Sequence, residues 1–193
     1  MPFASRGAAA LPVVALLAGC AYTGSSRGFD PAAFDRDPGW IAVRGVEPIL
    51  QEADSDCGAA ALAMVLRHWG LGTTRRDVFE ACGSPAGGIR AADLREYARK
   101  QGLKAFIIDG KFEDFEKELS KRRPVIVGTV KPHATFVLTH YEVVTGLHPG
   151  KKLVVTLDPA EGWRQNTWDG FMEEWRLARC MTLVVFRSEG DSK

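Results

Sequence analysis

The stretch from Gln51 to Leu66 constrains the fold of this chain more than any other part of its sequence. A polar loop, QEADSD, runs directly into the apolar segment CGAAALAMVL, and Cys57 stands at the junction. If that segment is a helix with about 100° per residue, its apolar side chains cover nearly the whole circumference. The pattern therefore predicts a central helix that other parts of the chain bury on all sides.

Cys57 occupies a position where a thiol is usually reactive. Unpaired N–H groups and the positive dipole end of a helix favour the thiolate, which is the form that attacks carbon. Gln51, six residues upstream, can supply a neutral hydrogen-bond donor beside that sulfur. The negative charge of Asp56 would oppose a thiolate, so we expect this residue to cap the helix instead. The alternative interpretation of Cys57 is a small, buried structural thiol.

Metal binding and nucleic-acid binding are not expected. The cysteines at positions 20, 57, 82 and 180 have neither the short paired spacing nor the neighbouring histidine that a zinc site needs. The formal net charge is +1, and the short basic run at 121–123 suits a helix end. The sequence thus predicts no metal, no cofactor and no nucleic acid. It leaves open whether Cys82 and Cys180 form a disulfide.

The beginning of the chain has the features of a bacterial lipoprotein. Arg6 precedes an apolar run at 7–19 that is too short to span a bilayer, so residues 1–19 are expected to be a signal peptide. The run ends in LAGC, which resembles a lipobox and implies that Cys20 is acylated and anchors the protein to a membrane. An ordinary cleaved signal is the alternative. In a Gram-negative host, Ala21 after that cysteine fits the outer membrane, facing the periplasm.

The remaining sequence is expected to form a tether, one globular domain and a tail. With 193 residues, of which 46% are hydrophobic, the chain can bury one sizeable core. Residues 20–39 are rich in Gly, Ser, Asp and Pro, which predicts a flexible tether. We expect the domain at 40–187 and a disordered tail at 188–193.

Within the domain, a helical pattern gives way to a strand pattern. Further helices are expected at about 75–82, 90–101 and 112–121, with a glycine-rich loop at 83–88. Strands are expected at 103–108, 125–130, 136–147, 153–157 and 181–186, with a last helix around 168–177. Helices followed by antiparallel strands indicate the α+β class.

One of the four histidines is the best candidate for a base that serves Cys57. His68 lies on the same helix, but eleven residues put it about 16 Å along the axis. His133 and His148 stand next to prolines and are expected to be solvated turn residues. His140 lies inside a mostly apolar strand, where a polar side chain costs free energy unless it has a partner. A core histidine satisfied by the backbone is its alternative role.

The segment from His148 to Lys152, HPGKK, is typical of a hairpin turn and supplies that partner. If the turn is centred near Pro149, His140 lies opposite Asp158, with Cβ atoms about 5 Å apart. A slip of two residues leaves them diagonal neighbours. Asp158 is therefore the expected orienting carboxylate, and Glu142, on the same face of the strand as His140, is the alternative.

Three blocks of this sequence together resemble the double-glycine, bacteriocin-processing peptidase family of the papain-like cysteine peptidase clan. The blocks are the loop and helix start around Gln51 and Cys57, the strand HYEVVTG at 140–146, and DPAEG at 158–162. The resemblance implies Cys57 as nucleophile, His140 as base, Asp158 as orienting residue and Gln51 as the oxyanion-hole side chain. It also implies a papain-like fold in which the helix that carries the cysteine packs on an antiparallel sheet.

The resemblance implies a cysteine peptidase that works without ATP. Many members are domains of ATP-driven exporters, but this sequence shows no transporter segment and no nucleotide-binding motif, so a stand-alone, lipid-anchored form is expected. Its partner would be an exported peptide or protein, with a glycine-glycine motif as the candidate cleavage site. The alternatives are a non-catalytic module that binds a peptide or a partner, and a cell-wall peptide amidase or transferase.

Overall fold

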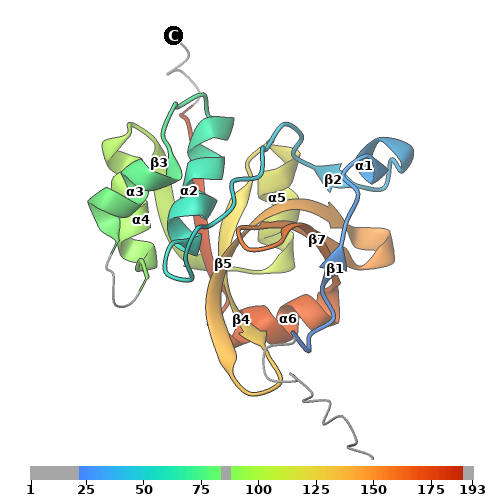
Figure 1. The fold of residues 1–193 in the computed structure, drawn as a ribbon. Helices are drawn as coiled ribbons and strands as arrows, with labels where there is room; N and C mark the ends of the chain where they lie inside the picture. Colours follow the sequence, from blue (N-terminus) through green and yellow to red (C-terminus); the bar gives the residue numbers. More distant parts are fainter. Residues whose placement is uncertain (1–21, 84–87, 189–193) are drawn as a thin grey trace, which may run out of the picture.

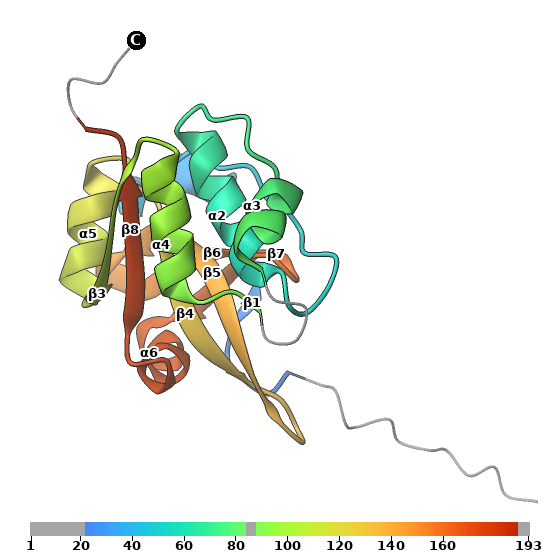
Figure 2. The same ribbon diagram turned by 90° about the vertical axis from the view of Figure 1, so that its left-hand side faces the viewer.

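The computed structural model describes residues 22–83 and 88–188. The expected signal peptide, Cys20 and residues 189–193 of the expected tail lie outside the described residues. An antiparallel sheet runs through the molecule, with helices on both of its faces (Figure 1). Helices α2, α3 and α4 gather on one face, whereas α5 and α6 lie against the other, and a view from the side shows the same separation (Figure 2). The α+β class expected from the sequence is confirmed.

The helices follow the expected order closely. Their bounds are α1 Ala33–Arg36, α2 Cys57–His68, α3 Arg75–Cys82, α4 Ala91–Lys100, α5 Phe112–Ser120 and α6 Trp168–Leu177. The start of α3 is fixed by a capping box, in which the Thr74 hydroxyl accepts from the Asp77 N–H and the Asp77 carboxylate accepts from the Thr74 N–H. No helix within 22–83 or 88–188 combines the length and apolar character needed to cross a bilayer.

Eight strands form one sheet. They are β1 Arg27–Gly28, β2 Ile41–Ala42, β3 Lys104–Asp109, β4 Val125–Pro132, β5 Val137–His148, β6 Leu153–Asp158, β7 Gly162–Thr167 and β8 Met181–Phe186. Their order is β1-β7-β6-β5-β4-β8-β3, every pair is antiparallel, and β2 pairs separately with β5. The sequence pattern missed β7, because GWRQNT lacks a clear apolar alternation and fully buries only Asn166.

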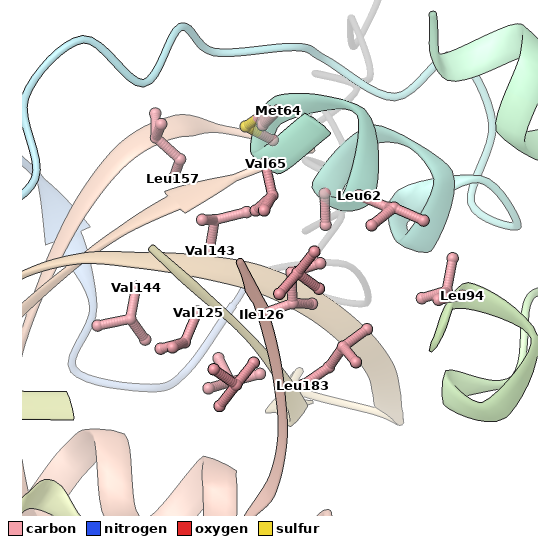
Figure 3. Close-up of a cluster of buried hydrophobic side chains, with 14 of the residues drawn as sticks. Leu62, Met64, Val65, Leu94, Val125, Ile126, Val143, Val144, Leu157 and Leu183 are labelled. Carbon is pink, nitrogen blue, oxygen red and sulfur yellow. The ribbon is translucent and has the colours of Figure 1, made fainter. Parts of the chain in front are cut away.

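Helix α2 is the centre of the core, as its sequence predicts. Every residue from Cys57 to Leu66 is buried. Figure 3 shows Leu62 and Val65 pointing at the sheet, where Val143 and Ile126 meet them, while Val144 points from the opposite face. Each fully buried aliphatic side chain of this kind contributes about 1.5–3 kcal/mol relative to exposure. This packing fixes the position of the helix, and therefore of the residue at its N-terminus.

The segment at 22–39 is attached to the domain and does not form the expected free tether. Strand β1 pairs with β7, and Phe34 is buried. The ring of Phe34 packs against Phe29, Trp40 and Trp163 at centroid distances of 5.0–5.9 Å. It also fills the space above Gly146, where a Cβ would lie 2.7 Å from the ring. The aromatic residues of the segment supply enough apolar surface to outweigh its glycine, serine and aspartate content.

Candidate active site

Three elements bring the predicted site residues together. Cys57 is the first residue of α2, His140 lies in β5, and Asp158 is the last residue of β6. All three are buried, with exposed fractions of 6%, 5% and 5%. The N-terminus of α2 points its unpaired N–H groups at this place, which is the environment that favours a thiolate.

His140 and Asp158 form a short, buried hydrogen bond. The Nε2 atom of His140 lies 2.7 Å from Oδ1 of Asp158. The strands reach this contact in a register two residues away from the expected one, because β6 pairs Leu157 with Val143. The turn between the strands is a 3₁₀ helix at Pro149–Lys151, and the register shifts again between 144 and 146. His140 and Asp158 are therefore diagonal neighbours across the two strands.

The side chain of His140 also interacts with the thiol of Cys57, and this interaction contributes to the pKa of the imidazole. Because Nε2 is engaged by Asp158, Nδ1 is the nitrogen that remains for the thiol. Burial alone would lower the pKa of His140, but the hydrogen bonds to Asp158 and Cys57 and their charges outweigh it and raise the pKa from 6.5 to about 10. The imidazole is thus protonated at neutral pH, and its charge stabilises a thiolate beside it.

Asp158 is held as a carboxylate. Burial would raise its pKa, but the hydrogen bond and charge of His140, the charge of Lys131 and the Ala160 N–H together lower it below the ordinary value. Oδ1 of Asp158 accepts from both His140 Nε2 and the Ala160 N–H, each at 2.7 Å. This arrangement fixes the orientation of the imidazole ring.

Gln51 lies in the loop that precedes α2 and is joined to the Asp158 end of the site. Its backbone N–H donates to the carbonyl of Pro159 at 2.8 Å. Its side-chain Oε1 is buried and has no hydrogen-bond partner within the described part of the chain. The loop that carries the expected oxyanion donor is therefore tied to the residue that follows Asp158.

Asp56 does not cap α2 with its side chain, contrary to expectation. Its carboxylate turns back onto the preceding loop, where it accepts from the N–H groups of Glu52 and Ala53, each at 3.3 Å. It also pairs with Arg75 from α3. The guanidinium offsets the charge of Asp56, so that this carboxylate does not oppose a thiolate at Cys57.

The other candidates for base and carboxylate are engaged elsewhere. Nε2 of His68 lies 2.9 Å from the carbonyl of Arg122, and His133 stacks on Phe136. His148, expected to be solvated, is buried and pairs with Asp37 at 3.1 Å. It is drawn inward because the N-terminal segment covers the hairpin turn. Glu142 accepts hydrogen bonds from Thr129 at 3.2 Å and Thr156 at 2.6 Å, not from His140.

A groove of about 580 Å³ opens at Cys57 and His140. One wall is the start of α2 with Ser55 and Ile89, and the other is formed by β4 and β5 with the end of α6. Its apolar lining includes Val130, Leu138, Leu177 and Met181. A groove with such walls and a thiol at its surface suits an extended peptide.

A buried lysine beside the site was not foreseen from the sequence. Lys131 follows the apolar run of β4 and lies with Nζ 2.6 Å from Glu142, 3.0 Å from Glu174 and 3.9 Å from Asp158. The only signal was its place directly after a buried strand, where a lysine is usually solvated. The three described cysteines, Cys57, Cys82 and Cys180, are free thiols, which answers the disulfide question for this structure.

Known proteins resemble this chain over the region that contains the site. The sequence profile of the Peptidase C39 family matches residues 46–187. The lactococcin-G-processing and transport ATP-binding protein LagD of Lactococcus lactis subsp. lactis is 29% identical over 128 residues, which is 66% of this chain. The chain spans only 17% of the length of that relative.

Solved structures share the fold. The peptidase domain of Streptococcus ComA, a bifunctional ABC transporter involved in quorum sensing, has a TM-score of 0.63 at 24% identity, over 75% of this chain and 100% of that one. A double-glycine-motif protease from an AMS/PCAT transporter, in complex with its leader peptide, has a TM-score of 0.61 at 25% identity, over 76% of this chain and 95% of that one. A C39-like peptidase from Bacillus anthracis has a TM-score of 0.64 at 16% identity, over 77% and 98%.

Proposed function

Because the chain belongs to the peptidase C39 family and is a cysteine peptidase, we propose that Cys57, His140 and Asp158 are its catalytic triad. The observation that carries the proposal is the buried hydrogen bond between His140 and Asp158, beside the groove that opens at Cys57 and His140. A sulfur nucleophile, a base and an orienting carboxylate in this order are the parts that acyl transfer to sulfur requires.

The reaction begins from the charged pair. The Cys57 thiolate attacks the scissile carbonyl carbon, which places a negative charge on the carbonyl oxygen. The Gln51 side chain and the backbone N–H of Cys57 stabilise that oxyanion. His140 then gives its proton to the leaving amine, and the amine departs as the thioester forms. Water, deprotonated by His140, attacks the thioester, and release of the acid restores the Cys57 thiolate beside the protonated His140.

The proposed substrate is an exported peptide or protein that lies extended in the groove, with a glycine-glycine motif as the candidate cleavage site. Two observations support this class. The groove is open along the β4–β5 wall and largely apolar, so a peptide backbone can reach Cys57 while its side chains contact Leu138, Leu177 and Met181. The AMS/PCAT relative, a double-glycine-motif protease, is 25% identical to this chain and is bound to a leader peptide.

The proposed place of action is the bacterial envelope. The lipobox-like LAGC at 17–20 supports acylation of Cys20 and attachment to the outer membrane, facing the periplasm. The substrate would meet the enzyme after crossing the inner membrane. Incorporation of an alkyne-labelled fatty acid tests this: labelling is expected for the wild-type chain and absent from Cys20→Ser, and equal labelling of both would contradict the anchor.

Comparison with an inactive variant tests the activity directly. The full chain and Cys57→Ala are incubated with envelope proteins and with synthetic peptides that contain or lack a glycine-glycine pair, and the products are identified by mass spectrometry. Cleavage by the wild type alone is expected, because truncation of a nucleophile typically removes about 10⁶-fold of the rate. Cys82→Ala, at a thiol outside the groove, is the matched control and should remain active.

Two results would contradict the proposal. Cleavage that persists in Cys57→Ala would remove Cys57 from the mechanism. Cleavage of cell-wall peptides in preference to every linear peptide would favour an amidase over a peptidase.

A further inference from the structure

We propose that Lys131 is a positioning residue of this active site: its ammonium group faces the second oxygen of Asp158 and keeps that carboxylate charged and directed at His140. The proposal rests on the assignment of Asp158 to the triad. It concerns a residue that touches neither the thiol nor the groove, since Lys131 does not line the groove at Cys57.

The two oxygens of Asp158 have different neighbours. Oδ1 accepts from His140 and from the Ala160 N–H, whereas Oδ2 lies 3.9 Å from Nζ of Lys131. The ammonium is therefore the charged group on the side of the carboxylate that faces away from the imidazole. A carboxylate held from both sides keeps its plane fixed, and this fixes the imidazole that it orients.

Glu142 and Glu174 hold Lys131 in this place. Nζ lies 2.6 Å from Oε1 of Glu142 in β5 and 3.0 Å from Oε2 of Glu174 in α6. The hydroxyl of Tyr22 donates to the other oxygen of Glu174, and its ring lies 5.5 Å from Nζ. The lysine side chain is 8% exposed and the three carboxylate side chains are 2–6% exposed, so no member of the group can relax into water.

The charges of this group make the ammonium necessary. Three buried carboxylates surround one lysine, and without the lysine they would repel one another in a medium of low polarity. Burial alone would lower the pKa of Lys131, but the charges of Glu142, Glu174 and Asp158 raise it above the ordinary value. Burial, in contrast, raises the pKa of Glu174. When the ammonium is removed, the pKa of Asp158 rises, because the charge of Lys131 is one of the causes that lower it.

Other ionisable groups near Asp158 do not replace the lysine. A small cavity of about 90 Å³ beside Asp158 is also lined by Arg164 and Glu161, which pair with each other at 2.8 Å, and by His133. The guanidinium of Arg164 also donates to Ser26. The imidazole of His140 lies on the Oδ1 side of Asp158, and it is the group that Asp158 orients.

The proposal predicts a change in pH dependence. In the wild type the charge of Lys131 helps to lower the pKa of Asp158, so this carboxyl stays ionised well into the acid range. Without the ammonium, Asp158 takes up its proton at a higher pH, and a neutral carboxyl no longer stabilises the imidazolium that the Cys57 thiolate needs. The acid limb of the activity profile should therefore move to higher pH.

The test compares variants of the full chain by two measurements. One is the rate of Cys57 alkylation by iodoacetamide between pH 4 and pH 9, with Cys20→Ser, Cys82→Ala and Cys180→Ala in every variant so that Cys57 is the reporter. The other is kcat and KM with a peptide that the wild type cleaves. Lys131→Met alone risks misfolding because it leaves three buried carboxylates. The informative variant is therefore Lys131→Met combined with Glu174→Gln, which keeps the net charge of the group.

In the double variant we expect the acid limb of both measurements to move to higher pH by about one unit. At a given pH on that limb, the rate should therefore be about tenfold lower than in the wild type. The change should appear in kcat, with KM unaltered. Lys131→Arg keeps the positive charge and should keep the wild-type acid limb. Glu174→Gln alone keeps the ammonium and its ion pair with Glu142, so its acid limb should move less than that of the double variant. A double variant that folds and keeps the wild-type acid limb in alkylation overturns the proposal.

The same experiment separates this proposal from the proposed function. Alkylation needs no substrate, so it reports on Lys131 even if every tested peptide resists cleavage. Failure of cleavage by the wild type contradicts the peptidase assignment, whereas an unshifted alkylation profile in the double variant contradicts the role of Lys131 alone.

Discussion

The helix that carries Cys57 and the strands that carry His140 and Asp158 differ in what is buried around them. From Cys57 to Leu66, α2 buries a cysteine, a glycine and aliphatic side chains, with no charge among them. On the strand side, the buried residues include Lys131, His140, Glu142 and Asp158, and Glu174 joins them from α6. The thiol of Cys57 thus stands on an apolar support, and the imidazole of His140 on a charged one.

The site has two requirements, a fixed position for the thiol and a defined protonation state, and the two sides meet them separately. Close packing fixes the position of α2 without adding charges that would disturb the thiol. Buried ion pairs contribute little net stability, because desolvation of the charges offsets their attraction, but they set protonation states. We therefore expect the strand side to determine how activity depends on pH, and the helix side to determine stability.

Asp158→Asn is the variant with the largest expected effect on catalysis, and it tests the strand side of this comparison. The amide keeps the shape of the carboxylate but not its charge, so the contribution of Asp158 to the raised pKa of His140 is reduced. By analogy with other triad enzymes, kcat should fall by about 10⁴-fold. Kinetic assays at several pH values measure the loss. Glu142→Gln is the control, since it removes a buried carboxylate that does not contact His140, and it should cost less than about tenfold.

Asp158→Asn should also change how the free energy of unfolding depends on pH. Folding raises the pKa of His140 from 6.5 to about 10, so proton binding stabilises the folded chain. This stabilisation is complete below pH 6.5 and is lost as the pH rises through about 10. In Asp158→Asn, the decline of the unfolding free energy over this range should be shallower, as measured by urea unfolding. An identical decline in both chains would contradict the assigned partnership.

Gln51→Ala is expected to have the next largest effect on catalysis. Loss of one oxyanion donor typically lowers kcat by about 10²–10³-fold, or about 3–4 kcal/mol in the barrier. The oxyanion exists only in the transition state and the intermediate, so the pH profile of Cys57 alkylation should not change. Glu52→Ala, at the next position, serves as the control. Wild-type turnover in Gln51→Ala would remove this residue from the oxyanion hole.

The helix side was open to prediction from the sequence, because its determinants are local. An apolar run without a polar face can only be a buried helix, and a cysteine at its start is placed by the run itself. The same holds for the hairpin, where HPGKK limited the pairing of β5 and β6 to a few registers. The register was wrong by two residues because the 3₁₀ turn moves the pairing by three residues and the irregularity near Thr145 moves it back by one, which local pattern does not reveal.

The charged side was not open to prediction in the same way. The pairing pattern singled out Asp158 and Glu142, but Lys131, Glu174 and Tyr22 come from three other segments, and each of these three alone looks like an ordinary surface residue. Only the folded chain shows that they neutralise one another. The N-terminal segment was misread for a related reason, since its composition suits a tether while its few aromatic side chains find a surface on β7.

The smallest effect on catalysis is expected from Leu62→Ala, which tests the helix side. Leu62 is fully buried between α2 and the sheet, and its loss leaves a cavity that costs about 3 kcal/mol of unfolding free energy. Leu62 belongs to a cluster of buried apolar side chains, so the pH profile of Cys57 alkylation should be that of the wild type at any temperature where the variant is folded. Leu62→Met, which nearly conserves volume, should cost less than about 1.5 kcal/mol. Urea unfolding and alkylation of the same samples decide the matter: a shifted pH profile in Leu62→Ala would mean that packing of α2, and not the buried charges alone, sets the protonation of the site.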